Sequence, residues 1–197
     1  FYLFNATAAA IPATLILFYV DDVLQQSGQE GLFLGVYFLA GLLTLPLWVK
    51  LSDRIGKVKA WLIGSVLASA ALATAAFLGS GDVLAYALVC LISGAALGAD
   101  LALPPAMLAD AIPASQRSNT GLYFGVWALI AKLSLALAAG AALPLLGVFG
   151  YVPGEPATAG NLALLYAVLP IGFKVLAAWV IWPRRFFSSR PTRESLL

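Results

Sequence analysis

Two long apolar stretches each contain a single charged residue, and these charges are the strongest chemical signal in the sequence. Residues 118–147 contain only Lys132, and residues 83–109 contain only Asp100. In a helix, Lys132 would lie roughly 18 Å beyond Thr120 at about 1.5 Å per residue, near the middle of a bilayer. A charge there costs at least about 2.5–3.5 kcal/mol unless it faces a cavity or a partner. Lys132 is therefore predicted to line a substrate or ion path, with a structural ion pair inside a helix bundle as the alternative.

Asp100 and three more polar side chains lie in apolar surroundings. Asp100 is placed closer to the cytoplasmic side than Lys132, where it could line the path, but a structural or gating pair is the favoured interpretation. Lys174 lies about eight residues from the end of the last apolar stretch, so its stem is predicted to reach the membrane surface by snorkelling. Asn5 and Thr7 have the amide and hydroxyl groups that bind carbohydrate, and they could equally form ordinary interhelical hydrogen bonds.

Two aromatic residues precede Lys132 on the same stretch. Tyr123 and Trp127 are four residues apart, so a helix would place them on one face. That face is turned by about 140° from Lys132, because Trp127 and Lys132 are five residues apart. Both aromatic side chains are predicted to line the cavity as platforms for a substrate.

Residues 50–59 form a polar stretch that is predicted to be a loop with a gating role. A loop that was merely basic would not need an acid beside an arginine, nor a glycine. An acid can cap a neighbouring helix while bases pair with acids on adjacent helix ends, which would form a cytoplasmic latch that can open. The predicted latch residues are Asp53, Arg54, Gly56, Lys57, Asp110 and Arg117.

The composition identifies the elements that must position these residues. The chain of 197 residues is 62% hydrophobic and 10% charged, whereas a soluble domain is about half apolar and about a quarter charged. A chain of this length cannot bury so much apolar surface in one core, so we expect an integral membrane protein. It has no His and one Cys, which excludes His-based catalysis, a Cys/His metal cluster and a disulfide. We expect neither an enzyme nor, at net charge +2, a nucleic-acid partner.

Six apolar stretches are long enough to cross a membrane as helices. Strands of a membrane barrel would be about half as long and would alternate in polarity, so the predicted fold is an all-α bundle of six transmembrane helices over residues 1–183. Residues 184–197 would form a cytoplasmic tail. Proline residues within these stretches should kink the helices rather than break them. The predicted helices are residues 1–20, 31–49, 60–81, 83–109, 118–147 and 161–183.

Basic residues predict the orientation of the bundle. Nine Lys and Arg residues lie in alternate connectors and in the tail on one side, and the other side has none. This asymmetry places residues 50–59 and both termini in the cytoplasm. Small residues four apart predict close contacts between helices within the chain, with dimerisation as the alternative. These pairs are Gly31/Gly35, Gly64/Ala68, Gly94/Gly98 and Ala136/Gly140.

Several motifs resemble those of one transporter family. The sequence DRIGK at residues 53–57 is similar to the cytoplasmic signature of the major facilitator superfamily. The order of LPPAMLAD at residues 103–110, TGLYFGVW at residues 120–127 and then Lys132 resembles the glycoside–pentoside–hexuronide:cation symporters of that superfamily. The resemblance covers essentially the whole chain as the C-terminal half of a twelve-helix transporter. One departure is Ile112-Pro113, where the family usually has Ile-Asp.

The resemblance implies a transporter in a bacterial inner membrane, with its central site between two halves that rock. It implies cation-coupled uptake of a sugar or glycoside, with Lys132 near the sugar and cation sites. The family's acidic ligands for Na⁺ or H⁺ lie in the N-terminal half, so we expect that missing half as a partner and no other cofactor or metal site. A lipid or lysolipid carrier on the same fold is the alternative function, and a non-transporting membrane scaffold is a third.

Overall fold

A computed structural model describes residues 1–181 of the chain. The described part consists of helices and connectors and contains no strand. The last residues of the predicted sixth helix and the predicted tail of residues 184–197, with four of the nine basic residues, lie outside the described part. Helices dominate because the polar backbone groups of a segment in a membrane must form their hydrogen bonds within that segment.

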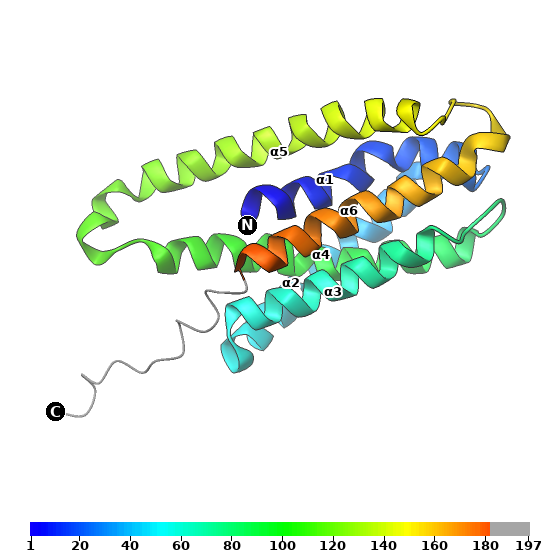
Figure 1. The fold of residues 1–197 in the computed structure, drawn as a ribbon. Helices are drawn as coiled ribbons and strands as arrows, with labels where there is room; N and C mark the ends of the chain where they lie inside the picture. Colours follow the sequence, from blue (N-terminus) through cyan, green and yellow to red (C-terminus); the bar gives the residue numbers. More distant parts are fainter. Residues whose placement is uncertain (182–197) are drawn as a thin grey trace.

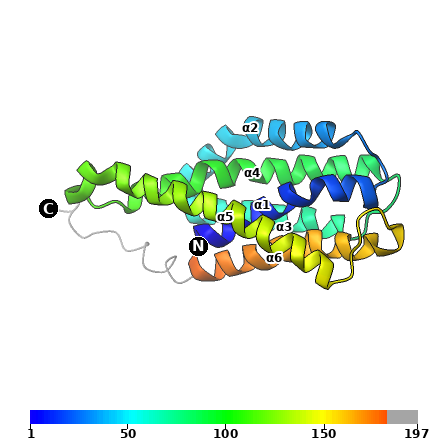
Figure 2. The same ribbon diagram turned by 90° about the horizontal axis from the view of Figure 1, so that it is seen from above.

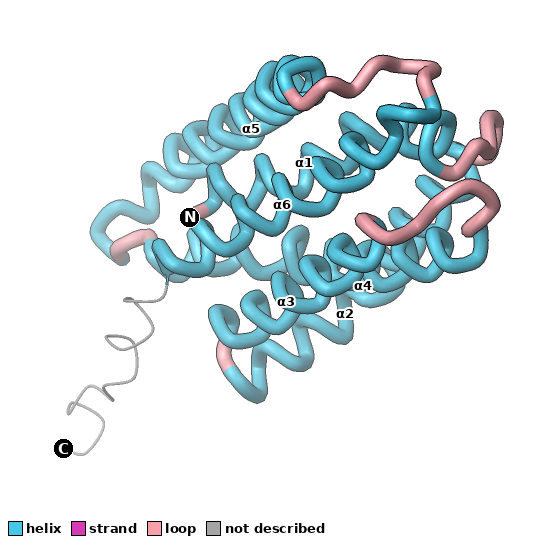
Figure 3. Tube along the Cα trace, turned by 45° about the vertical axis from the view of Figure 1, so that its right-hand side comes forward, coloured by secondary structure: helices cyan, strands magenta, loops and turns pink. Residues whose placement is uncertain are grey.

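Six long helices run alongside one another, and their connectors lie at the two ends of the bundle (Figures 1 and 3). Each is long and apolar enough to cross a membrane, which confirms the predicted all-α fold of six spanning helices. They are α1 (Tyr2–Phe18), α2 (Glu30–Ile55), α3 (Lys57–Ala75), α4 (Val83–Ala111), α5 (Thr120–Val148) and α6 (Ala159–Ile181). Three shorter helical turns flank them, namely η1 (Tyr19–Val23), η2 (Ala114–Asn119) and η3 (Pro156–Thr158).

The connection between α2 and α3 is shorter than predicted. Residues 50–55 continue α2, and α3 begins at Lys57, so only Gly56 separates the two helices. Gly56 has φ +89°, in the left-handed region that is open to glycine without steric cost. The predicted loop of residues 50–59 is therefore wrong, because polar residues can extend a helix beyond the apolar core until a residue turns the backbone.

Proline residues do not interrupt the helices. Each of α1, α2, α4, α5 and α6 continues through at least one internal proline. This agrees with the prediction that they would not break the helices. The prolines inside helices are Pro12, Pro46, Pro104, Pro105, Pro144 and Pro170.

Glycines set the close approach of α2 and α4. A Cβ added to Gly94 would lie 2.3 Å from the backbone oxygen of Tyr37, and one added to Gly98 would lie 2.7 Å from Thr44 Oγ1. Gly64 likewise allows α3 to approach Ala99 of α4. Such contacts are how helices gain van der Waals packing in lipid. The predicted packing role is therefore confirmed for these glycines.

The other small-residue pairs do not pack in this way. Cβ atoms added to Gly31, Gly35 and Gly140 would meet no atom within 4 Å. The prediction that these three glycines bring helices together within the chain is therefore wrong. They lie on faces of α2 and α5 that no described helix covers closely.

Helix α5 lies at the edge of the bundle and packs mainly against α1 (Figures 1 and 2). Its buried side chains are spaced about four residues apart and face α1; they are Ser134, Ala138, Ala142 and Leu146. The opposite side of α5 carries exposed apolar residues, including Leu129 and Leu135. This helix therefore presents a long apolar face away from the other described helices.

A polar contact joins the connectors at the end of the bundle where α1 finishes. The Tyr151 hydroxyl donates to the Asp22 carboxylate, and the Gly154 backbone N–H donates to the same carboxylate at 3.2 Å. Burial of Tyr151 and its hydrogen bond to Asp22 raise the pKa of this hydroxyl above the ordinary tyrosine value. The contact ties the segment after α5 to the end of α1.

Candidate functional site

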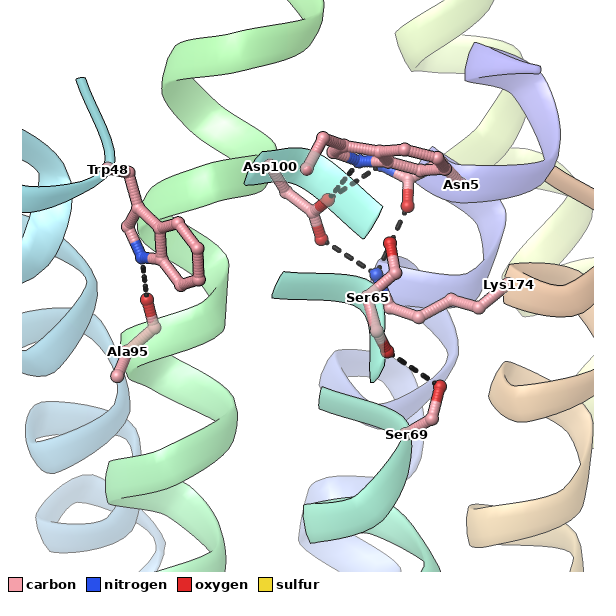
Figure 4. Close-up of polar contacts among 8 residues, drawn as sticks. Asn5, Trp48, Ser65, Ser69, Ala95, Asp100 and Lys174 are labelled. Carbon is pink, nitrogen blue, oxygen red and sulfur yellow. Dashed lines mark hydrogen bonds and ion pairs between the residues drawn. The ribbon is translucent and has the colours of Figure 1, made fainter. Parts of the chain in front are cut away.

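Four helices meet at the Asp100 carboxylate (Figure 4). Asp100 Oδ1 accepts hydrogen bonds from Asn5 Nδ2 of α1 at 3.0 Å and from Trp61 Nε1 of α3 at 2.9 Å. Asp100 Oδ2 accepts from Lys174 Nζ of α6 at 2.9 Å, which also makes an ion pair. Lys174 Nζ donates in addition to Asn5 Oδ1 at 3.1 Å. We call Asn5, Trp61, Asp100 and Lys174 the buried polar cluster.

The cluster is almost sealed from its surroundings. The Lys174 and Asp100 side chains are 4% and 11% exposed, and Asn5 is 1% exposed. A buried charge is tolerated when it is paired and when its remaining hydrogen-bonding groups are satisfied. The Asp100 carboxylate accepts hydrogen bonds from three donors. The Asn5 amide donates to this carboxylate and accepts from the Lys174 ammonium, so it bridges the two charges. In this arrangement the cluster is electrically neutral and joins α1, α3, α4 and α6.

The predicted role of Lys174 is wrong, because its ammonium points into the bundle and not toward the membrane surface. The snorkelling interpretation relied only on the distance from the helix end. A long Lys stem can equally turn inward when a carboxylate on a neighbouring helix lies within reach. The structure thus gives Asp100 a specific ionic partner on α6.

Beside the cluster lies a small, partly open cavity of about 50 Å³. Asp100 and Lys174 line one part of it, and most of the remaining wall consists of alanine and other apolar side chains. Ser65, one helical turn after Trp61, is 5% exposed, and its hydroxyl has no hydrogen-bond partner. Figure 4 shows this hydroxyl pointing toward the Lys174 ammonium. A cavity of this size can hold water where polar groups converge.

Lys132 lies apart from the cluster, on the exposed side of α5. Ser134, two residues later, faces α1 and bonds the Leu3 carbonyl, and a two-residue step turns a helix by about 200°. Lys132 therefore points away from α1. Among the described residues Lys132 forms no ion pair. The structure therefore does not show the alternative prediction, a structural ion pair of Lys132 inside the bundle.

The remaining predicted cavity residues occupy three further places. Trp127 stacks on Tyr2 of α1 with ring centroids 3.4 Å apart, and both rings are partly exposed. The Tyr123 hydroxyl donates to the Gln116 side chain near the start of α5. Thr7 is buried and donates to the Leu3 carbonyl of its own helix. The structure therefore brings Asn5 and Asp100 together and leaves the other four predicted residues outside the buried polar cluster.

The predicted latch residues lie at the other end of the bundle from the Tyr151–Asp22 contact. Lys57 Nζ, at the start of α3, lies 2.5 Å from Asp110 Oδ2, near the end of α4. Asp53, Arg54 and Arg117 are exposed and form no ion pair within residues 1–181. Gly56 serves as the turn described above. Within the described residues the latch therefore has one closed pair, and its gating role stays a prediction.

Two members of the site were missed from the sequence. Trp61 and Ser65 lie in an apolar stretch without charges, and nothing local marks them as functional. The available signal was physical, since an indole N–H that is buried requires an acceptor. In the described part of the chain no group of His, Cys, Asp and Glu could hold a metal ion.

The comparisons with known proteins agree with this architecture. The family described as MFS/sugar transport protein matches the chain over residues 1–185. No curated protein and no solved structure gave a significant match. Six spanning helices and a match over nearly the whole chain lead to one conclusion: this integral membrane protein belongs to the MFS/sugar transport protein family and is a transporter of the major facilitator type.

Proposed function

We propose that the chain is the C-terminal half of a secondary transporter that takes up a sugar or glycoside together with Na⁺ or H⁺ by alternating access. The observation that carries the proposal is Lys132, a charge on the exposed apolar side of α5 that forms no ion pair among residues 1–181. Lipid around this residue would impose a cost of at least about 2.5–3.5 kcal/mol. A protein surface or a water-filled path against this face removes that cost, and a second half of the transporter would provide both.

The aromatic pair supports a sugar as the substrate. Tyr2 and Trp127 present partly exposed rings from two adjacent helices. Ligand sites combine such apolar platforms with a few polar groups that set orientation. The name of the matching family also includes sugar transport. In this proposal the sugar packs against the aromatic pair near the interface between the halves.

The buried polar cluster supports placing the coupling-cation ligands in the other half. Asp100 is the only acid in the middle of a described spanning helix, and its carboxylate already has three donors including an ammonium. A coupling ion would have to displace Lys174 to bind there. Carboxylates in the N-terminal half would instead lie opposite Lys132, whose charge could hold the cation and sugar sites in register.

The proposal is tested by expressing the protein from its native gene and measuring sugar uptake in membrane vesicles. Lys132→Ala should abolish cation-coupled sugar uptake in membrane vesicles while expression and thermal stability stay unchanged. Lys132→Arg should rescue little, because a planar guanidinium does not replace a compact ammonium. Leu129→Ala, one turn away on the exposed side of the same helix, is the control. Normal coupled uptake by Lys132→Ala would reject the proposed site.

A lysolipid carrier is the second candidate, and the apolar surroundings of Lys132 are the observation that favours it. A lipid head group could pair with the ammonium while its chain lay on the exposed face of α5. The same vesicles loaded with labelled lysophospholipid separate the candidates. Lysolipid movement that depends on Lys132, without sugar uptake, would favour the second.

A further inference from the structure

An open pocket lies at the turn between α2 and α3, at the basic end of the bundle. Its residues are far in sequence from Lys132. Its volume is about 470 Å³. Two basic side chains and three apolar ones line it, namely Arg54, Ile55, Lys59, Leu62 and Ile63. A pocket with this lining combines positive charge with an apolar floor.

The tight turn at Gly56 places the two basic residues on the same pocket. Arg54 is in the last turn of α2 and Lys59 is in the first turn of α3. Both are exposed, and among the described residues neither forms an ion pair. Lys57, between them, has its own acid in Asp110. The two pocket charges therefore remain available to an anion, and Asp53 does not line the pocket.

The apolar part of the pocket continues along the membrane-spanning part of α3. Lys59, Ile63 and Val66 are spaced so that they lie along one side of the helix. Ile63 is 49% exposed and Val66 is 69% exposed, and Val66 lies roughly 10 Å from Lys59 along the helix axis. Residues 60–81 contain no charge. Unlike the face of α5 that carries Lys132, this side of α3 can therefore lie directly against hydrocarbon.

We propose that this pocket binds an anionic phospholipid of the surrounding leaflet. The phosphate would lie between Arg54 and Lys59, and an acyl chain would follow Ile63 and Val66 into the membrane. Basic pockets between spanning helices on the cytoplasmic side suit such head groups, and the positive-inside orientation would place this pocket there. A soluble anion would use the two charges but not the apolar floor. The site is separate from the solute path and does not depend on which solute is transported.

Lipid retention by the purified protein tests the proposal. The protein is mixed in detergent with phosphatidylglycerol or with phosphatidylcholine, and bound lipids are counted by native mass spectrometry. Wild type should retain phosphatidylglycerol preferentially. At about 1 kcal/mol per basic residue, Arg54→Gln with Lys59→Gln should lower its association constant roughly 30-fold. Phosphatidylcholine retention should not change.

Matched variants separate the pocket from general charge. Lys50→Gln with Arg117→Gln removes two exposed basic residues that the pocket does not include, and should reduce retention by less than about threefold. Arg54→Lys with Lys59→Arg keeps both charges and should retain the lipid, which guards against a fold defect. Glycerol phosphate in excess should not displace the lipid, because it lacks acyl chains. Equal losses in the two Gln variants, or displacement by glycerol phosphate, would overturn the proposal.

Discussion

Removing either charge of the buried polar cluster should destabilise the protein, and the two losses of stability should be unequal. Asp100→Leu would leave the Lys174 ammonium with only the Asn5 carbonyl as acceptor. Lys174→Met would leave the Asp100 carboxylate with two N–H donors, from Asn5 and Trp61. The carboxylate therefore keeps more compensation than the ammonium. We expect Asp100→Leu to destabilise the protein more than Lys174→Met does.

The expected sizes follow from removing one partner of a buried pair. Such changes cost about 3–5 kcal/mol, so we assign about 3 kcal/mol to Lys174→Met and about 5 kcal/mol to Asp100→Leu. The double variant has no buried charge, but it leaves the Trp61 N–H and the Asn5 amide without their acceptor, at about 1–3 kcal/mol for each orphaned group. We expect the unfolding free energy of the double variant to be about 3 kcal/mol below that of wild type, because no unpaired charge remains buried.

Reversible unfolding by SDS in mixed micelles, followed by circular dichroism, measures all four proteins of this cycle. Independent effects would place the double variant about 8 kcal/mol below wild type, whereas the pair predicts a coupling energy of about 5 kcal/mol. Lys174→Arg serves as a control that retains the charge. If the two single effects added within about 0.5 kcal/mol, the ion pair would not hold these helices together.

Three further outcomes are expected. Gly94→Ala should destabilise the bundle by about 2 kcal/mol or more, because its Cβ would meet a backbone oxygen at 2.3 Å, whereas Gly35→Ala in open space should change unfolding by less than about 0.5 kcal/mol. Tyr151→Phe should cost about 1 kcal/mol by removing the hydrogen bond to Asp22. The folded pKa of Tyr151 is raised, so the hydrogen bond should contribute fully to stability below about pH 10, the pKa of a free tyrosine. Its contribution should disappear only as the pH rises through the folded pKa. The unfolding free energy of the Tyr151→Phe variant should not show this loss. Asp110→Asn should change stability by less than about 1 kcal/mol, because its pair with Lys57 is largely exposed, while a transport assay with binding measured separately would reveal any slowing of the conformational cycle.

The spanning helices could be predicted because membrane burial requires long apolar stretches whatever their neighbours. The end of α2 could not, since the polar residues before Gly56 are compatible with both a loop and a helix that extends into water. Nothing in their composition decides between these states. The left-handed backbone of Gly56 does, and a glycine in the sequence does not reveal whether its φ is positive.

Helix contacts were only partly predictable from small residues. Gly94 and Gly35 both belong to pairs with the same four-residue spacing, yet only Gly94 lies against another helix. Spacing shows that a face is smooth enough for close approach, but it does not show which helix lies opposite. That choice depends on the rotation of each helix, which the whole bundle determines. The position of Lys174 has the same origin, since its inward orientation required a carboxylate on α4 at the same depth.

Lys174 and Lys132 differ in their surroundings. Lys174 contributes to the fold, and Lys132 bears on the proposed function. Lys174 has its counter-charge on α4, so the chain compensates it without help from outside. Lys132 projects from the side of α5 that faces away from α1 and forms no ion pair in the described part of the chain. A charged side chain in a spanning helix almost always faces a bundle interior or a water-filled cavity. In the proposed function, Lys132 marks the face at which a second half would pack, and its charge would line a transport path between the two halves.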